Sequence, residues 1–253
     1  MVRRESTCVA VFPIDLFAYF LGQCQKVGPG TGKLARSRQG AKKRNFYQVP
    51  ILMKQLIYVH WWMVFPDNEA LCKTLETREY NPFQDRLRWK DFLKEKLTGK
   101  YEVIKPDMPN KHMACYKARK IWFEKIFPYL NDEGLVVVGH SLGWMFLLKY
   151  ISENWFPKKI KQLHLTASCL DETNMPEEEK YMGDFLFDLN TIPKVQDFVE
   201  NIFIYHSTDD PVVPYEHAEK LYSYLPKAKL ITLTDRGHIM QIEFPELYEN
   251  LLK

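Results

Sequence analysis

The chain has 253 residues, of which 46% are apolar and 14% aromatic, so it can form a sizeable hydrophobic core and is not a disordered chain. The formal charge of +3 is unevenly placed: residues 1–52 carry nine Lys and Arg against Glu5 and Asp15, which leaves −4 on residues 53–253. A folded part that is mildly acidic argues against a nucleic-acid groove. No apolar run reaches about 18 residues, so no membrane span is expected.

Residues 1–52 lack sustained periodicity and are rich in Gly, Arg, Lys and Gln, which is typical of disorder. Met53 immediately precedes a strand-like segment. We therefore expect a basic N-terminal extension over residues 1–52, disordered or non-native, and one folded domain over residues 53–253.

Cysteine usage and the first apolar stretch bear on location. The five cysteines are odd in number, widely spaced and contain no CxxC, so neither a disulfide framework nor a zinc site is predicted. The stretch "CVAVFPIDLFAYFLG" behind Arg3 and Arg4 resembles a secretory signal, but Pro13 and Asp15 interrupt it. A cytoplasmic location is expected.

From residue 53 onward, short apolar runs alternate with longer helical patterns. Strands are predicted at 55–60, 101–106, 135–140, 160–168, 202–207 and 229–235, and helices at 68–77, 85–97, 111–130, 141–153, 214–225 and 244–251. Strands separated by helices need crossover connections, which predicts an α/β fold with a central, mostly parallel sheet of about six strands covered on both faces. Ligands of such sheets bind beyond the carboxyl ends of the strands.

The motif "GHSLG" at residues 139–143 follows a predicted strand directly and opens a predicted helix. This context indicates a nucleophile elbow, a turn so tight that Gly139 and Gly143 are needed, which lifts Ser141 to the rim of the sheet. The N-terminus of the following helix directs backbone N–H groups towards a developing oxyanion. The structural alternative is a glycine-rich turn that contains a serine by chance.

A serine nucleophile needs a histidine base held by a carboxylate. Asp210, in "TDDPVVP", follows the strand at 202–207, and His238, in "RGHIM", follows the last strand. His60 and His206 also end strands and are rivals, but only His238 follows the acid in the order Ser, Asp, His. Asp209 is the alternative acid, and both aspartates could instead cap a turn.

Residues 53–253 resemble the α/β-hydrolases, and specifically the small lidless serine hydrolases of the retinoblastoma-binding protein 9 family. The segments "GHSLG", "HSTDDPVVPYEHAEKL", "RGH" and "IYVH" carry the resemblance. It implies a three-layer sandwich without a large lid, with Ser141 as nucleophile, Asp210 as acid and His238 as base. It also implies an oxyanion hole formed by the N–H of Leu142 and one from the loop after the first strand.

Tryptophans replace glycines that the family usually has beside the site. The chain reads "HWW" where relatives read His-Gly-Gly, and "GHSLGW" where they read GHSLGG. Trp61 or Trp62 can still donate a backbone N–H to the oxyanion hole, but their bulk can also tilt the loop and turn a donor away. A second interpretation makes Trp61, Trp62, Trp144 and His140 substrate-binding residues. A third has the indoles only fill space near the sheet.

Residues 169–201 occupy the position of the lid in larger relatives. The segment is short and acidic, with room for one or two helices, so an open site for small esters, thioesters or short peptides is expected. Its acidic run at 177–179 predicts a solvated helix start.

The leading hypothesis is a serine hydrolase that cleaves a small-molecule acyl substrate through an acyl-enzyme. No metal-ligand spacing or nucleotide cofactor is indicated, and neither a nucleic-acid nor a membrane partner is expected. The alternative is a catalytically weak, hydrolase-like binding or scaffold protein whose oxyanion loop is obstructed by Trp61 and Trp62. Acyl transfer to an alcohol or amine is a third possibility.

Overall fold

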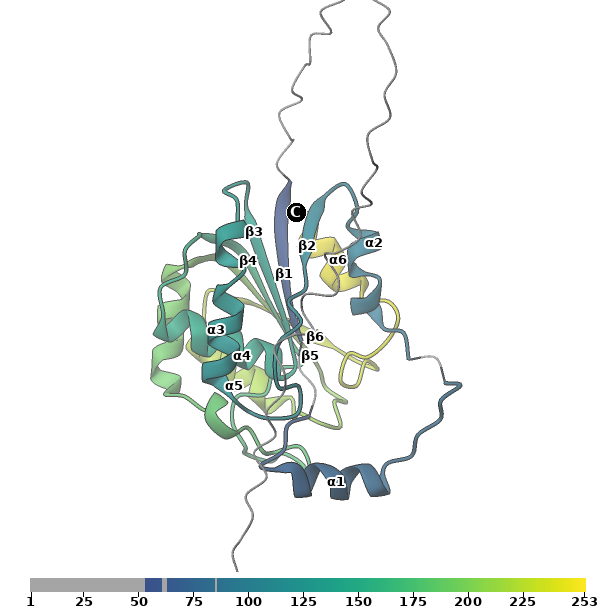
Figure 1. Cartoon of the computed structure of the whole chain (residues 1–253). Helices are drawn as coiled ribbons and strands as arrows, with labels where there is room; N and C mark the ends of the chain where they lie inside the picture. The colour runs from purple at the N-terminus through teal and green to yellow at the C-terminus, as the bar shows by residue number, and fades with distance from the viewer. Residues whose placement is uncertain (1–52, 61–62, 85) are drawn as a thin grey trace, which may run out of the picture. The chain divides into compact units, whose positions relative to one another are not determined.

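The computed structural model describes residues 53–60, 63–84 and 86–253, all within one compact unit, Pro50–Lys253. The expected extension over residues 1–52 lies outside the described residues. Six strands form one sheet in the order β2-β1-β3-β4-β5-β6, and every neighbouring pair is parallel (Figure 1). The strands are β1 (Lys54–His60), β2 (Tyr101–Ile104), β3 (Leu135–His140), β4 (Ile160–Thr166), β5 (Val199–Ser207) and β6 (Lys229–Leu233). The sequence-based prediction of a parallel sheet is confirmed.

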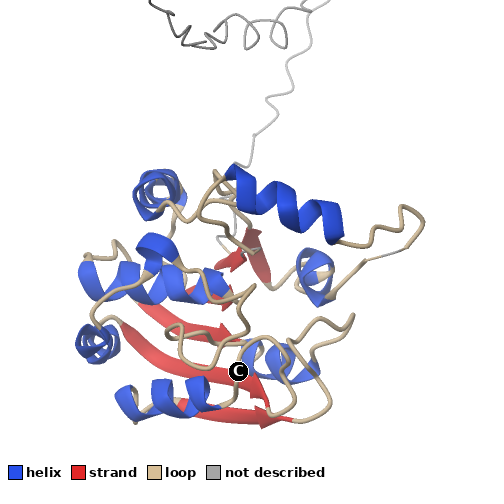
Figure 2. Cartoon of the chain, turned by 90° about the horizontal axis from the view of Figure 1, so that it is seen from below, coloured by secondary structure: helices blue, strands red, loops and turns tan. Residues whose placement is uncertain are grey.

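Helices lie on both sides of the sheet (Figure 2). One face is covered by α3 (Tyr116–Glu124), α4 (Leu142–Glu153) and α5 (Glu216–Tyr224), and the other by α2 (Leu93–Lys96) and α6 (Pro245–Leu251). Side chains of β1 alternate between the two cores, with Ile57 and Val59 in the first and Leu56 and Tyr58 in the second. A strand buried on both faces reads as a continuous apolar run, which is why β1 and β3 were evident in the sequence.

The remaining helix, α1 (Asn68–Thr77), buries none of its side chains in either core. It begins after Asp67, whose carboxylate accepts a hydrogen bond from the Ala70 N–H at 2.8 Å and so caps the helix. Its position follows from the loop after β1 rather than from packing on the sheet.

Two predicted helices are shorter than expected because tertiary hydrogen bonds hold their ends in other conformations. In 85–97, only a 3₁₀ helix (Trp89–Asp91) and α2 form. The indole of Trp89 donates to the carbonyl of Ile239 at 3.0 Å. In 111–130, the buried Arg119 guanidinium donates to the carbonyls of Asn110 and Met113, which fixes the preceding residues as a loop.

The segment between β4 and β5 contains two 3₁₀ helices, Gly183–Phe185 and Leu189–Asp197, and no large lid is present in the part of the chain that the structure describes. The acidic run at 177–179 is not a helix start, so that prediction is wrong. No helix among residues 53–60, 63–84 and 86–253 has the length and apolar character needed to cross a bilayer.

Candidate active site

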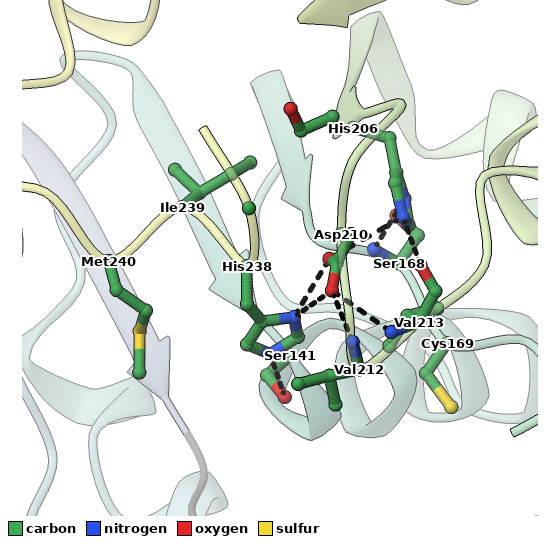
Figure 3. Close-up of polar contacts among 12 residues, drawn as sticks. Ser141, Ser168, Cys169, His206, Asp210, Val212, Val213, His238, Ile239 and Met240 are labelled. Atoms are coloured by element: carbon green, nitrogen blue, oxygen red, sulfur yellow. Dashed lines mark hydrogen bonds and ion pairs between the residues drawn. The ribbon is translucent and has the colours of Figure 1, made fainter. Parts of the chain in front are cut away.

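The carboxyl ends of β3, β5 and β6 lie at one edge of the sheet, and three polar side chains meet there (Figure 3). His238 Nε2 lies 3.1 Å from the Ser141 hydroxyl oxygen. His238 Nδ1 lies 2.9 Å and 3.1 Å from the two carboxylate oxygens of Asp210. The three residues that sequence reasoning selected therefore form one hydrogen-bonded chain.

The turn that carries Ser141 is strained and closely packed. Ser141 has φ 53° and ψ −136°, a conformation in the positive-φ region that side chains other than glycine rarely adopt. A Cβ at Gly139 would lie 2.6 Å from the Cα of Trp144, and one at Gly143 would lie 2.3 Å from the carbonyl oxygen of Val59. The two glycines thus let β3 and α4 approach β1 closely enough for the serine to project at the edge.

We expect Gly143→Ala to lower the free energy of unfolding by about 3 kcal/mol, measured by urea denaturation, because the new methyl group meets the backbone of a central strand that cannot yield cheaply. Gly99→Ala is a comparison with a different cause of strain. Gly99 has φ 75° and no atom within 4 Å of an added Cβ, so its loss of about 1 kcal/mol reports backbone strain alone, whereas Gly143 has no positive φ and its loss reports the contact. An unchanged free energy of unfolding in Gly143→Ala would show that the contact with β1 contributes nothing.

Asp210 is held by more than its contact with His238. Its side chain is fully buried, and the N–H groups of Val212 and Val213 donate to Oδ1 at 2.8 Å and 3.0 Å. Burial by itself raises the pKa of Asp210, but the hydrogen bond from His238 and those from the two backbone N–H groups outweigh it, so the pKa lies below its ordinary value. The carboxylate is therefore ionised at neutral pH and able to accept the His238 Nδ1–H.

Asp209, the alternative acid, faces a different partner set. Its Oδ1 accepts hydrogen bonds from the Ser207 hydroxyl and from the N–H groups of Arg236 (3.3 Å) and Gly237 (3.2 Å). Asp209 thus ties the end of β5 to the loop that precedes His238, while Asp210 contacts the imidazole itself.

His206, one of the rival histidines, lies on the side of Asp210 that is away from His238 (Figure 3). Its Nε2 lies 2.8 Å from the carbonyl oxygen of Val213 and 3.6 Å from Asp210 Oδ2, while the N–H of Ser168 donates to its Nδ1 at 3.2 Å. These contacts place the ring proton on Nε2. Burial lowers the pKa of His206, so the ring is neutral and supports the loop that carries Asp210.

His60, the other rival, pairs with His140 beneath the site. The two Nδ1 atoms lie 3.0 Å apart, and His140 Nε2 lies 3.1 Å from the carbonyl oxygen of His238. Because His140 donates from Nε2, its Nδ1 accepts from His60. His140 is only 1% exposed and contacts the main chain of His238, but it also lines the cavity beside Ser141, so its expected role in substrate binding stays a prediction.

A cavity of about 240 Å³ opens beside Ser141. Apolar side chains form much of its wall, and charged groups complete it. The lining residues include Leu71, Leu75, Arg78, Arg88, Glu179 and Met240. Sequence reasoning identified α1 as a helix but assigned none of these residues to the site, because the helical pattern does not show what a helix faces.

The tryptophans divide into two cases. Trp144 is fully buried in the core and is not one of the described residues that line the cavity. The prediction that it binds substrate is therefore wrong. Trp144 lies in the first turn of α4 with its Cα close to Gly139 of β3, and it fills space near the sheet. Trp61 and Trp62 lie outside the described residues, and the predictions about them stay predictions.

Leu142 is the first residue of α4, so its N–H belongs to the group of helix N-terminal donors without an acceptor inside the helix. Ser141 and Leu142 both line a pocket of about 20 Å³. No cluster of His, Cys, Asp and Glu suited to a metal ion occurs among the described residues.

A parallel sheet flanked by helices, with a serine on a strained strand-to-helix turn, defines the class of α/β-hydrolases. Solved structures share this fold: the ydeN gene product from B. subtilis has a TM-score of 0.58 at 17% identity, covering 79% of this chain and 97% of its own. A meta-cleavage product hydrolase from Pseudomonas fluorescens has a TM-score of 0.55 at 13% identity, covering 79% of this chain and 89% of its own.

Sequence comparison gives the family. The model of the serine hydrolase family matches residues 83–247, so the chain belongs to that family and is a serine hydrolase. Serine hydrolase RBBP9 of Rattus norvegicus is 27% identical over 154 residues, which make up 60% of this chain and 77% of that relative.

Proposed function

We propose that this serine hydrolase cleaves small carboxylic esters or related acyl compounds through an acyl-enzyme, with Ser141 as nucleophile, His238 as general base and Asp210 as its orienting acid. The observation that carries the proposal is the continuous chain of hydrogen bonds from the Ser141 hydroxyl through both nitrogens of His238 to the buried carboxylate of Asp210.

The proposed mechanism follows from the proton positions in this chain. Asp210 accepts the Nδ1–H of His238, which leaves the Nε2 lone pair directed at the Ser141 hydroxyl. When Ser141 attacks the scissile carbonyl carbon, His238 Nε2 takes its proton and then delivers it to the leaving alcohol. Water, deprotonated by the same nitrogen, attacks the acyl-enzyme and releases the acid.

Leu142 is proposed as one oxyanion donor, because the N–H following the nucleophile lies at the start of α4, where the helix dipole favours negative charge. The second donor, expected from Trp61 or Trp62, lies outside the described residues. The substrate is proposed to be a small molecule, since the cavity beside Ser141 is about 240 Å³.

Labelling with a fluorophosphonate probe tests the proposed nucleophile. We expect stoichiometric modification of the wild-type protein at Ser141, located by peptide mass spectrometry, and none in Ser141→Ala. Ser168→Ala is the matched control, since Ser168 is a fully buried serine near the same edge of the sheet and should leave labelling intact. Absence of labelling in the wild type, or equal labelling of Ser141→Ala, would contradict the proposal.

A further inference from the structure

The cavity beside Ser141 combines an apolar wall with guanidinium groups. Leu71, Thr74 and Leu75 of α1 line it at spacings of three and four residues, so they share one face of the helix, and Arg78, the extended C-cap residue that follows, lines it as well. At 1.5 Å rise per residue, the helical face extends over about 6 Å from Leu71 to Leu75. The wall thus changes from apolar to cationic along its length.

Arg88 contributes a second guanidinium to the same cavity. Its Nη1 donates to the Sδ atom of Met240 at 2.9 Å, and Met240 also lines the cavity. Partial burial lowers the pKa of Arg88, but a guanidinium stays protonated in proteins. A half-buried positive charge at a cavity wall is less screened than a surface charge, so an anion placed there gains more than it would at the surface.

The surroundings of Arg78 extend the positive potential outward. A neighbouring hollow of about 460 Å³ shares Leu75, Arg78 and His112 with the cavity and is also lined by Arg86 and Lys111. Lys111 pairs with Asp107 at 3.0 Å, and Arg86 lies over the ring of Tyr80. Glu79 also lines this hollow, so its wall carries the three cationic side chains of Arg78, Arg86 and Lys111 and one carboxylate.

Among the described residues, Glu179 is the one carboxylate in the cavity wall. It also lines the pocket of about 20 Å³ next to Ser141. Burial raises the pKa of Glu179, while the charges of His238 and Arg78 lower it. The two arginines therefore outweigh it in the balance of charge.

We propose that this cavity selects acyl substrates that carry a carboxylate, with the apolar chain along Leu71 and Leu75 and the carboxylate bound by Arg78 and Arg88. This inference rests on the proposed function. The carboxylate can belong to the acyl chain or to the leaving group, because either part of the substrate could occupy the cavity beside Ser141.

The test compares esters that differ only in a terminal charge. Mono-p-nitrophenyl adipate and p-nitrophenyl hexanoate probe the acyl side, and the hexanoyl esters of para-hydroxybenzoate and para-hydroxybenzamide probe the leaving-group side. We expect the charged member of one pair to have a kcat/KM about tenfold higher than its neutral partner. This ratio should fall as ionic strength rises.

Variants assign the preference to residues. Arg78→Gln and Arg88→Gln are each expected to lower the charged-to-neutral ratio of kcat/KM about tenfold, and Arg88→Lys, which keeps the charge, should restore part of it. Glu179→Gln should raise the ratio. Arg86→Gln is the matched control, because Arg86 lines the outer hollow and not the cavity, so it should lower the ratio much less than Arg78→Gln or Arg88→Gln does.

The outcomes separate this inference from the proposed function. Hydrolysis of neutral and charged esters at equal kcat/KM, or a ratio that Arg78→Gln and Arg88→Gln leave unchanged, overturns the inference and leaves the proposed function standing. Failure to hydrolyse any of the four esters overturns both. Thermal unfolding of each variant at the wild-type temperature excludes misfolding as the cause of a lowered ratio.

Discussion

Asp210→Asn is expected to lower kcat about 10⁴-fold for any ester that the protein hydrolyses. The amide of the variant can present its NH₂ group to His238 Nδ1, which favours the imidazole tautomer with the proton on Nε2. That tautomer cannot accept the proton of Ser141. Steady-state kinetics with a p-nitrophenyl ester measure the loss, and unfolding by urea checks that the variant remains folded.

The adjacent aspartate provides the matched control. In Asp209→Asn, the side-chain oxygen can still accept hydrogen bonds from the Ser207 hydroxyl and the N–H groups of Arg236 and Gly237. We therefore expect a loss below about tenfold, since only the positioning of the His238 loop is affected. Losses of the same size in both variants would contradict the assignment of Asp210 as the orienting acid.

The sequence predicted the fold class correctly because the strands of a parallel sheet are buried on both faces and read as uninterrupted apolar runs. It also predicted which edge of the sheet to inspect, because polar residues follow β3, β5 and β6. Ser141, Asp210 and His238 lie together at that edge, although no one of their local patterns requires it.

Features that depend on side-chain direction were not predictable from the sequence. Asp209 and Asp210 are identical in the sequence pattern, and only the hydrogen bonds from Val212 and Val213 turn the second carboxylate towards His238. Trp144 was expected at the cavity but is buried in the core, because an N-terminal residue of α4 can face the sheet as readily as the edge.

The cavity wall was missed for a related reason. Arg78 and Arg88 follow no motif, and both line the cavity from the chain that follows α1. Loop paths depend on tertiary contacts, such as that between the Trp89 indole and Ile239, which periodicity does not encode. Those contacts also order the loop of His238, so the wall of the cavity and the proposed base depend on the same interactions.

Lowering the pH below about 6 is expected to destabilise the fold by at least about 3 kcal/mol per pH unit. Burial lowers the pKa of His60 to about 2 and that of His164 to about 3, and it also lowers the pKa values of His140 and His206. Below about pH 6.5 the unfolded chain takes up a proton at His60 and at His164 and the folded chain does not. The contribution of these neutral imidazoles to the free energy of unfolding is therefore fully present above that pH and is lost progressively below it.

Urea denaturation from about pH 7.5 to about pH 5 measures this slope, and His164→Gln isolates one contribution. His164 contacts the Tyr205 hydroxyl and the side chain of Gln162, so the variant retains hydrogen-bonding capacity, and the slope should fall by about 1.4 kcal/mol per pH unit. The lowered pKa of Asp210 acts in the same direction, but only below about pH 4, so it does not enter this window. A stability that stays constant down to about pH 5 would show that these histidines accept protons in the folded state. Because His60, His140 and His206 support His238 and Asp210, that outcome would also remove the argument that neutral imidazoles hold the proposed catalytic chain in place.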